Sequence, residues 1–163
     1  MENKSLIRKL NFIEIYQFFG GIIGLLIMVY LLTTTNVSEY KSFFNILLIL
    51  PFIFFTFCIY SAWLINRKKY LRGLNLILIS FFFQLFAFDL YGVFYTSVNG
   101  LAINLILDLT DDILVRLDFQ PSQFLLVFKS GTLFYFKLNL VALGMFIFTS
   151  KILKELKDNV YVL

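Results

Sequence analysis

FFNILLILPFIFFTFCIYSAWLI, residues 43–65, is an apolar run without a charged side chain, and the basic stretch NRKKYLR, residues 66–72, follows it directly. Residues 73–95 then form a second apolar run, in which Asp89 is the one charged residue. A helix needs about 20 apolar residues to cross a hydrocarbon core about 30 Å thick. The pattern therefore predicts two membrane-spanning helices joined by a tight basic loop.

Two further apolar runs flank this pair. Residues 12–32 precede it; the run is too long for a signal peptide and no small-residue cleavage site follows it, so a retained helix is expected. Residues 132–153 come after it, and Lys137 interrupts that run. The sequence therefore predicts an all-α membrane protein, a four-transmembrane-helix bundle that forms a single domain over residues 1–163.

The composition excludes an ordinary soluble domain. Hydrophobic residues make up 60% of the chain and charged residues 15%, whereas soluble domains average about 45–50% and about 25%. The chain has 0 His and a single cysteine, Cys58, which rules out a Ser-His-Asp triad, histidine metal ligands and an internal disulfide. No HExxH, GxSxG, P-loop or GxGxxG motif occurs either. We therefore expect no enzyme activity, no cofactor and no metal site.

The basic residues predict the orientation in the membrane. Ten of the 14 Lys and Arg residues fall in three clusters next to apolar runs: Lys4, Arg8 and Lys9; Arg67, Lys68, Lys69 and Arg72; Lys151, Lys154 and Lys157. Basic segments beside spans stay in the cytoplasm, so a multi-pass protein of the inner or plasma membrane with both termini cytoplasmic is expected. The net charge of +4 would also suit nucleic acid, but no polar domain carries a binding patch, so no nucleic-acid partner is expected.

The segment between the third and fourth predicted spans, residues 96–131, is too apolar for a solvated loop and too often interrupted by Asp for another span. Residues 103–109 and 115–119 alternate in part between apolar and polar side chains. This alternation favours a small outward-facing β-rich insertion between the two helices. An amphipathic helix over residues 101–117 is the alternative, because the Asn and Asp residues there also share a helical face.

A hairpin is predicted at the end of that segment. Residues 124–128 and 133–138 are apolar stretches separated by Lys129-Ser130-Gly131-Thr132, and a short glycine-containing stretch between apolar runs is typical of a hairpin turn. In either form, we expect the segment to cap the bundle or to pack against a neighbouring subunit.

Three charged residues lie at membrane depth in the predicted spans, away from the basic clusters: Glu14, Asp89 and Lys137. A charge at the centre of a membrane helix costs roughly 2.5–3.5 kcal/mol on insertion scales, so such residues are candidates for function. Asp89 and Lys137 lie near the outer ends of neighbouring spans and are predicted to form an ion pair, with a gating or substrate role as the alternative. Glu14 lies near the cytoplasmic face, where it either handles ions or protons or extends to the interface.

A helix-packing face is predicted on the first span. Gln17, Gly21 and Gly24 share one helical face with Glu14, and Gly20 and Gly24 have the GxxxG spacing. Small residues at this spacing let another helix approach closely. The expected contact is with a neighbouring helix, in the same chain or in a second copy.

Two functions are consistent with these patterns. The small size, the glycine-rich face and the charges at membrane depth favour a protein that self-assembles in the bilayer, as a pore, a channel or a membrane-perturbing effector. The alternative is a non-transporting accessory or scaffold subunit of a larger membrane complex, favoured by the 22 Phe residues, which offer a wide apolar contact surface. The expected partners are the lipid bilayer and either further copies of the chain or another membrane protein.

Overall fold

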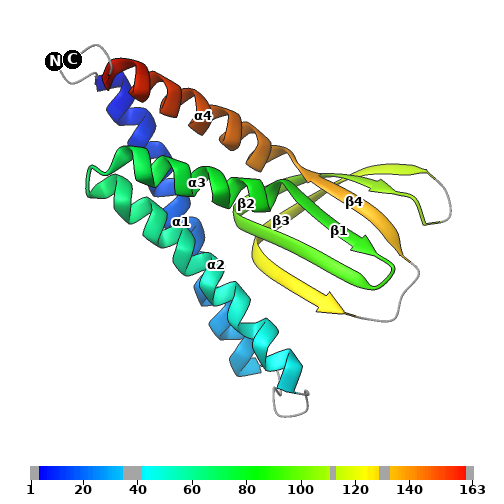
Figure 1. Cartoon of the computed structure of the whole chain (residues 1–163). Helices are drawn as coiled ribbons and strands as arrows, with labels where there is room; N and C mark the ends of the chain where they lie inside the picture. The colour runs from blue at the N-terminus through cyan, green and yellow to red at the C-terminus, as the bar shows by residue number, and fades with distance from the viewer. Residues whose placement is uncertain (1–3, 35–41, 111–112, 129–132, 161–163) are drawn as a thin grey trace.

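The computed structural model describes residues 4–34, 42–110, 113–128 and 133–160. Within them the chain forms four helices and a four-stranded antiparallel sheet (Figure 1). The elements are α1 (Lys4–Thr34), α2 (Ser42–Asn66), α3 (Tyr70–Leu85), β1 (Phe86–Leu90), β2 (Val93–Asp108), β3 (Leu114–Phe128), β4 (Phe134–Asn139) and α4 (Leu140–Val160). The expected all-α four-transmembrane-helix bundle is therefore wrong, and the fold is of the α/β class.

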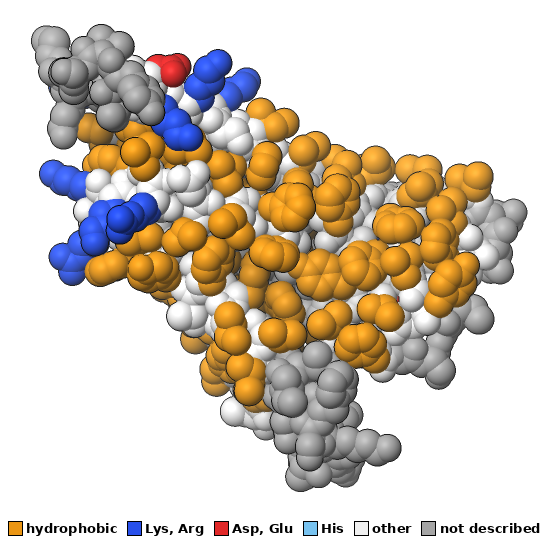
Figure 2. Space-filling view, viewed as in Figure 1, with side chains coloured by type: hydrophobic (Ala, Val, Ile, Leu, Met, Phe, Trp, Pro, Cys, Tyr) orange, Lys and Arg blue, Asp and Glu red, His pale blue; other side chains and the backbone are white. Residues whose placement is uncertain are grey.

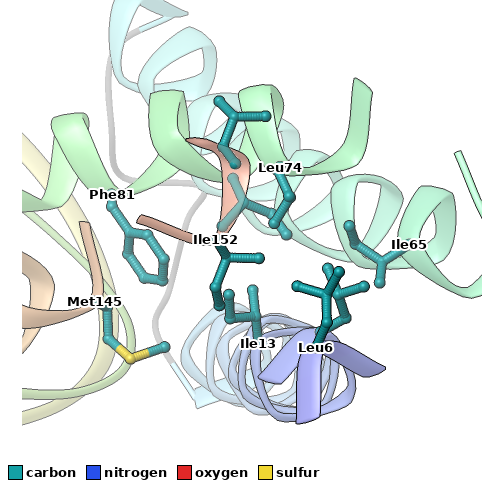
Figure 3. Packing of buried hydrophobic residues seen from close by; sticks show 10 residues of the cluster. Leu6, Ile13, Ile65, Leu74, Phe81, Met145 and Ile152 are labelled. Carbon is teal, nitrogen blue, oxygen red and sulfur yellow. The ribbon is translucent and has the colours of Figure 1, made fainter. Parts of the chain in front are cut away.

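The helices meet at one end of the molecule, where α1 begins, α4 ends and the short turn between α2 and α3 lies (Figure 1). Their shared core contains Leu6 and Ile13 of α1, Ile65 of α2, Leu74 of α3 and Ile152 of α4 (Figure 3). An ion pair between Lys9 Nζ and Glu155 Oε2, 2.8 Å apart, joins α1 to α4 at this end. The three basic clusters that are far apart in sequence thus lie together, because the helix ends that carry them are packed side by side.

Two of the four predicted spans are continuous helices. α1 covers residues 12–32 and α2 covers residues 43–65, with Pro51 inside it. Within the described part of the chain, Lys4–Thr34 and Ile49–Asn66 are the two helical stretches long and apolar enough to cross a membrane. The multi-pass arrangement of four such helices is not supported.

The third predicted span is half helix and half sheet. α3 ends at Leu85 and β1 begins at Phe86, and a two-residue turn follows in which Tyr91 and Gly92 both have positive φ, 49° and 98°. Positive φ at both central residues is the geometry of the tight turn that matches the twist of a hairpin. The prediction failed because an apolar run has the same mean hydropathy whether it is helical or extended.

The fourth predicted span is also divided. β4 occupies its first part, and α4 begins after Asn139, whose Oδ1 accepts a hydrogen bond from the backbone N–H of Ala142 at 3.1 Å. Asparagine is a favoured helix N-cap, because its side chain satisfies a free N–H of the first turn. Lys137 was expected in the fourth helix, but it lies in β4, just before α4 begins at Leu140.

The strand order is β1-β4-β2-β3, and β1 also pairs with the start of β2. β2 is irregular between Val98 and Leu101; its first residues pair with β1 and its last residues, from Asn104 to Asp108, pair with β4. Because β4 pairs with both β1 and the far end of β2, the sheet is strongly curled (Figure 1). The amphipathic helix considered for residues 101–117 does not form.

The predicted pairing of the two stretches on either side of residues 129–132 is wrong as well. The turn itself lies outside the described residues, but the strands on either side of it, β3 and β4, are not neighbours in the sheet. β3 pairs with β2 over its whole length, from Leu114 to Phe128. In the strand order, β2 lies between the strands that contain the two apolar stretches, residues 124–128 and 133–138.

Candidate functional site

The curled part of the sheet has two faces of opposite chemistry. Residues directly opposite each other on paired strands share a face, so the register assigns them. The polar face carries Asp89 of β1, Asn104 and Asp108 of β2, Arg116 and Asp118 of β3, and Tyr135, Lys137 and Asn139 of β4. The apolar face carries Phe86, Phe88 and Leu90; Ile103, Leu105 and Leu107; Val115, Leu117 and Phe119; Phe134, Phe136 and Leu138.

In a soluble protein, the apolar face of a sheet is normally buried and the polar face exposed. In this sheet several residues of the polar face are buried and the apolar face is exposed. On the polar face, Asp89 and Asn104 are 0% and 2% exposed, and Lys137 is 9% exposed. On the apolar face, Phe119 is 72% exposed and Leu117 is 59% exposed. Buried polar groups cost free energy unless they are hydrogen-bonded or paired, so the polar face must be held by specific contacts.

Two ion pairs lie on the polar face. Lys137 Nζ is 3.1 Å from Asp118 Oδ2, and Arg116 Nη2 is 2.9 Å from Asp108 Oδ2. The Nε2 of Gln120 also donates to Asp118 Oδ2, at 2.7 Å. The ammonium group of Lys137 lies 5.6 Å from the centre of the Tyr135 ring, within cation–π range. The two ion pairs therefore connect β3 to both β4 and β2.

Asp108 also organises the end of the β2–β3 hairpin. Its Oδ1 accepts hydrogen bonds from the backbone N–H and the hydroxyl of Thr110, at 3.1 and 2.8 Å. The Thr110 hydroxyl oxygen in turn accepts from the backbone N–H of Phe134 at 3.1 Å, which connects the hairpin to β4. The hydrogen bonds from Thr110, helped by the positive charge of Arg116, lower the pKa of Asp108 below its usual value.

A cavity of about 290 Å³ lies among Ile106, Arg116, Leu117, Asp118, Tyr135 and Lys137. Two cationic side chains and one carboxylate line it. At roughly 30 Å³ of liquid volume per water, this space is large enough for a small hydrated ion or a cluster of waters. The chemistry available there is electrostatic and hydrogen-bonding.

A second polar cluster joins the helices to the sheet. Gln17 Nε2 donates to Ser80 Oγ at 2.7 Å, and Asn99 Nδ2 donates to the backbone oxygen of Gln17 at 3.1 Å. Gln84 connects the same groups, because its Nε2 donates to Ser80 Oγ at 2.9 Å and its Oε1 accepts from the Asn99 N–H at 2.8 Å. All four residues are buried, so this cluster fixes α1 and α3 against β2.

The glycines of the predicted packing face lie against other parts of the same chain. A Cβ on Gly24 would overlap the Phe55 ring of α2, and one on Gly21 would lie 2.7 Å from Ile59. A Cβ on Gly20 would meet the backbone nitrogen of Gly100 in β2 at 2.7 Å. This face is therefore occupied within one copy of the protein.

The three predicted intramembrane charges lie in different places. Glu14 lies on α1 near the basic end, where its Oε1 accepts a hydrogen bond from Asn66 Nδ2 at 3.0 Å. Asp89 and Lys137 are brought to the same face of the sheet, since Asp89 is opposite Tyr135 and Ala87 is opposite Lys137. The carboxylate that Lys137 contacts at 3.1 Å is that of Asp118.

Sequence reasoning did not select Asp108, Arg116 or Asp118. Their signal is the partial alternation within residues 103–108 and within residues 115–119. It places Asn104 and Asp108 on one side of the first strand, with Ile106 between them, and Arg116 and Asp118 on one side of the second. The alternation identifies a polar face, but the partner of each charge depends on strand order and register. Sequence spacing does not carry that information.

Among the residues described, no group of three or more His, Cys, Asp and Glu is placed to hold a metal ion. Comparison with protein families, curated proteins and solved structures finds no match to this chain. The polar face and its ion pairs are therefore the basis for a functional proposal.

Proposed function

We propose that this chain is an integral membrane protein that self-assembles in the bilayer and acts as a pore-type protein, with the polar face of the sheet lining a hydrophilic path. The observation that carries the proposal is the inverted sheet. On its polar face Asp89, Asn104 and Lys137 are buried, whereas the Arg116 side chain on the edge strand is 59% exposed. On its apolar face Leu117 and Phe119 are exposed. An exposed apolar surface of this extent favours contact with lipid or with another protein.

The surface of the whole molecule supports a membrane location. Figure 2 shows basic side chains gathered at one end and apolar side chains over most of the remaining visible face. α1 and α2 supply two helices that are long and apolar enough to span a bilayer. In the proposed orientation the basic end faces the cytoplasm, where Lys and Arg are favoured next to anionic headgroups.

Assembly is part of the proposal because the polar-face cavity of one copy is too small for a channel. The cavity on the polar face is about 290 Å³, which is the size of a binding site rather than of a path across a bilayer. A continuous path therefore requires the polar faces of two or more copies to adjoin.

The second candidate is a non-transporting subunit of a larger membrane complex. It is favoured by the apolar groove of about 340 Å³ between α2, α3 and the sheet, lined by Leu50, Ile53, Phe54, Phe57, Ile79, Phe83, Tyr95 and Phe124. An apolar groove of this kind suits a helix or a lipid chain from outside the protein. The pore proposal ranks first because it also accounts for the polar face.

The test is ion flux through the purified protein in liposomes and planar bilayers. Lys137→Gln removes a cation that lines the cavity, and the matched control Lys151→Gln removes one from α4 at the basic end. The proposal expects flux from the unmodified protein and a shift towards cation selectivity in Lys137→Gln alone. Protein that inserts and assembles without any flux would contradict the pore and leave the accessory subunit.

A further inference from the structure

The free edge of the sheet is the first half of β3. β3 is the last strand in the order β1-β4-β2-β3, and β2 is its one partner among the described strands. At Ser122 and Phe124 the helices cover it, because Ser122 Oγ donates to the backbone oxygen of Gly20 and the Phe124 ring packs on Phe54. Leu114, Leu117 and Phe119 are instead 57–72% exposed. The open edge therefore ends near Pro121.

An open edge is unfavourable in the environment proposed above. Each unpaired backbone N–H or C=O that lies in hydrocarbon costs several kcal/mol, so sheets in a bilayer are closed or paired. In water, exposed edges are usually blocked by charges, bulges or proline. Here Pro121 marks the limit of the edge, and the residues before it remain able to pair.

The sequence of this edge is self-complementary. Val115-Arg116-Leu117-Asp118-Phe119 has a central apolar residue, one charge of each sign beside it and an apolar residue outside each charge. In an antiparallel pair of two identical strands centred on Leu117, Arg116 of one copy lies opposite Asp118 of the other. Opposite charges at directly opposed positions stabilise a strand pair, whereas like charges destabilise it.

We infer that β3 of one copy pairs antiparallel with β3 of a second copy, in the register that sets Leu117 opposite Leu117. The apolar faces of the two sheets then join, with Val115 opposite Phe119. On the polar face, the Lys137–Asp118 pair within each copy gains Arg116 of the second copy. Two oppositely charged pairs at the centre of the interface select this partner and this register.

The inference rests on the proposed function and names the interface through which the copies associate. Arg116 and Asp118 line the cavity on the polar face, so this pairing brings the cavities of the two copies to the same interface. A hydrophilic space larger than either cavity then forms where the charges meet.

Cysteine cross-linking in membranes tests the register. Leu117→Cys is expected to form a disulfide-linked dimer of about twice 19.1 kDa, because directly opposed residues of paired strands are within disulfide reach. The matched control Leu105→Cys lies on the same apolar face of β2, away from the edge, and should remain monomeric. The native Cys58 is fully buried and should not react.

Mixed copies give a sharper result. Val115→Cys alone and Phe119→Cys alone should not cross-link. A mixture of the two variants should, because Val115 of one copy lies opposite Phe119 of the other.

A second, charge-based test uses Arg116→Asp and Asp118→Arg. Each variant alone should associate roughly tenfold or more weakly, and mixing the two should restore association.

The outcomes separate this inference from the pore proposal. Flux without cross-linking at Leu117→Cys would overturn the β3 interface and leave the pore standing. Cross-linking at Leu117→Cys without flux would support the interface and reject the pore. Equal cross-linking of Leu105→Cys and Leu117→Cys would also overturn the register.

Discussion

Lys137 of β4 reaches across β2 to contact Asp118 of β3, with 3.1 Å between Nζ and Oδ2. The two side chains come from strands that are not neighbours, so the ion pair connects three strands of the curled sheet. The Lys137 side chain is 10% exposed and the Asp118 side chain is 34% exposed. A cation this enclosed depends on its carboxylate partner more than a surface lysine does.

Removing either partner is expected to destabilise the fold. Asp118→Asn and Lys137→Gln should each lower the free energy of unfolding by about 1–3 kcal/mol, less than for a fully buried pair because water reaches Asp118. The double variant should recover part of the loss, since it leaves no uncompensated charge. Denaturant unfolding in detergent measures this, with Lys151→Gln as the control; strictly additive losses would contradict the coupling.

Two helical glycines, Gly24 in α1 and Gly144 in α4, predict opposite effects of substitution. Gly24→Ala should destabilise the protein by about 1–3 kcal/mol, because the new Cβ would overlap the Phe55 ring. Gly144→Ala should be neutral or stabilising by up to about 1 kcal/mol, because nothing lies within 4 Å of its Cβ position in α4. Thermal unfolding of the two variants compares them directly, and equal melting temperatures would contradict the packing of Gly24 on α2.

Asp108 predicts a pH dependence of stability at the hairpin. Its pKa in the folded protein is below the usual 3.8, because Thr110 donates two hydrogen bonds to it and Arg116 pairs with it. A carboxyl group whose folded pKa is lowered stabilises the fold above its unfolded pKa, and the stabilisation is lost as the pH falls through the folded pKa. Asp108→Asn should therefore reduce the loss of stability on acidification below about pH 4.

Unfolding midpoints at a series of pH values measure this effect. Thr110→Val serves as the matched variant, because it removes the hydroxyl donor to Asp108 and keeps the carboxylate. It should show an intermediate pH dependence. Identical acid profiles for the unmodified protein and Asp108→Asn would rule out the contribution of this carboxylate.

The proposed orientation predicts which surfaces are accessible in intact cells. Lys69 lies in the α2–α3 turn at the basic end, and Ile113, which is 76% exposed, lies between β2 and β3. Ile113→Cys should react with a membrane-impermeant thiol reagent in intact cells, and Lys69→Cys should react only after permeabilisation. The opposite labelling pattern would reverse the orientation.

Local sequence was sufficient for the features that depend on composition and contiguous length. The runs at residues 12–32 and 43–65 were predicted as helices from their apolar length, and both are helical. The basic clusters could likewise be located next to apolar runs from the sequence. The alternation in residues 103–109 and 115–119 indicates strands for the same local reason. None of these inferences requires a residue distant in sequence.

Only the tertiary structure decided where α3 gives way to β1 at Leu85 and Phe86, and which carboxylate Lys137 contacts. Helix and strand bury the same apolar side chains, so hydropathy does not separate them in residues 73–95; pairing of β1 with β2 and β4 does. Likewise Lys137 meets Asp118 because β2 lies between β4 and β3 in this register. The sequence determined that this chain is apolar and that its basic residues cluster beside the apolar runs. Helix packing brought those clusters to one end, and strand order determined which charges on the polar face meet.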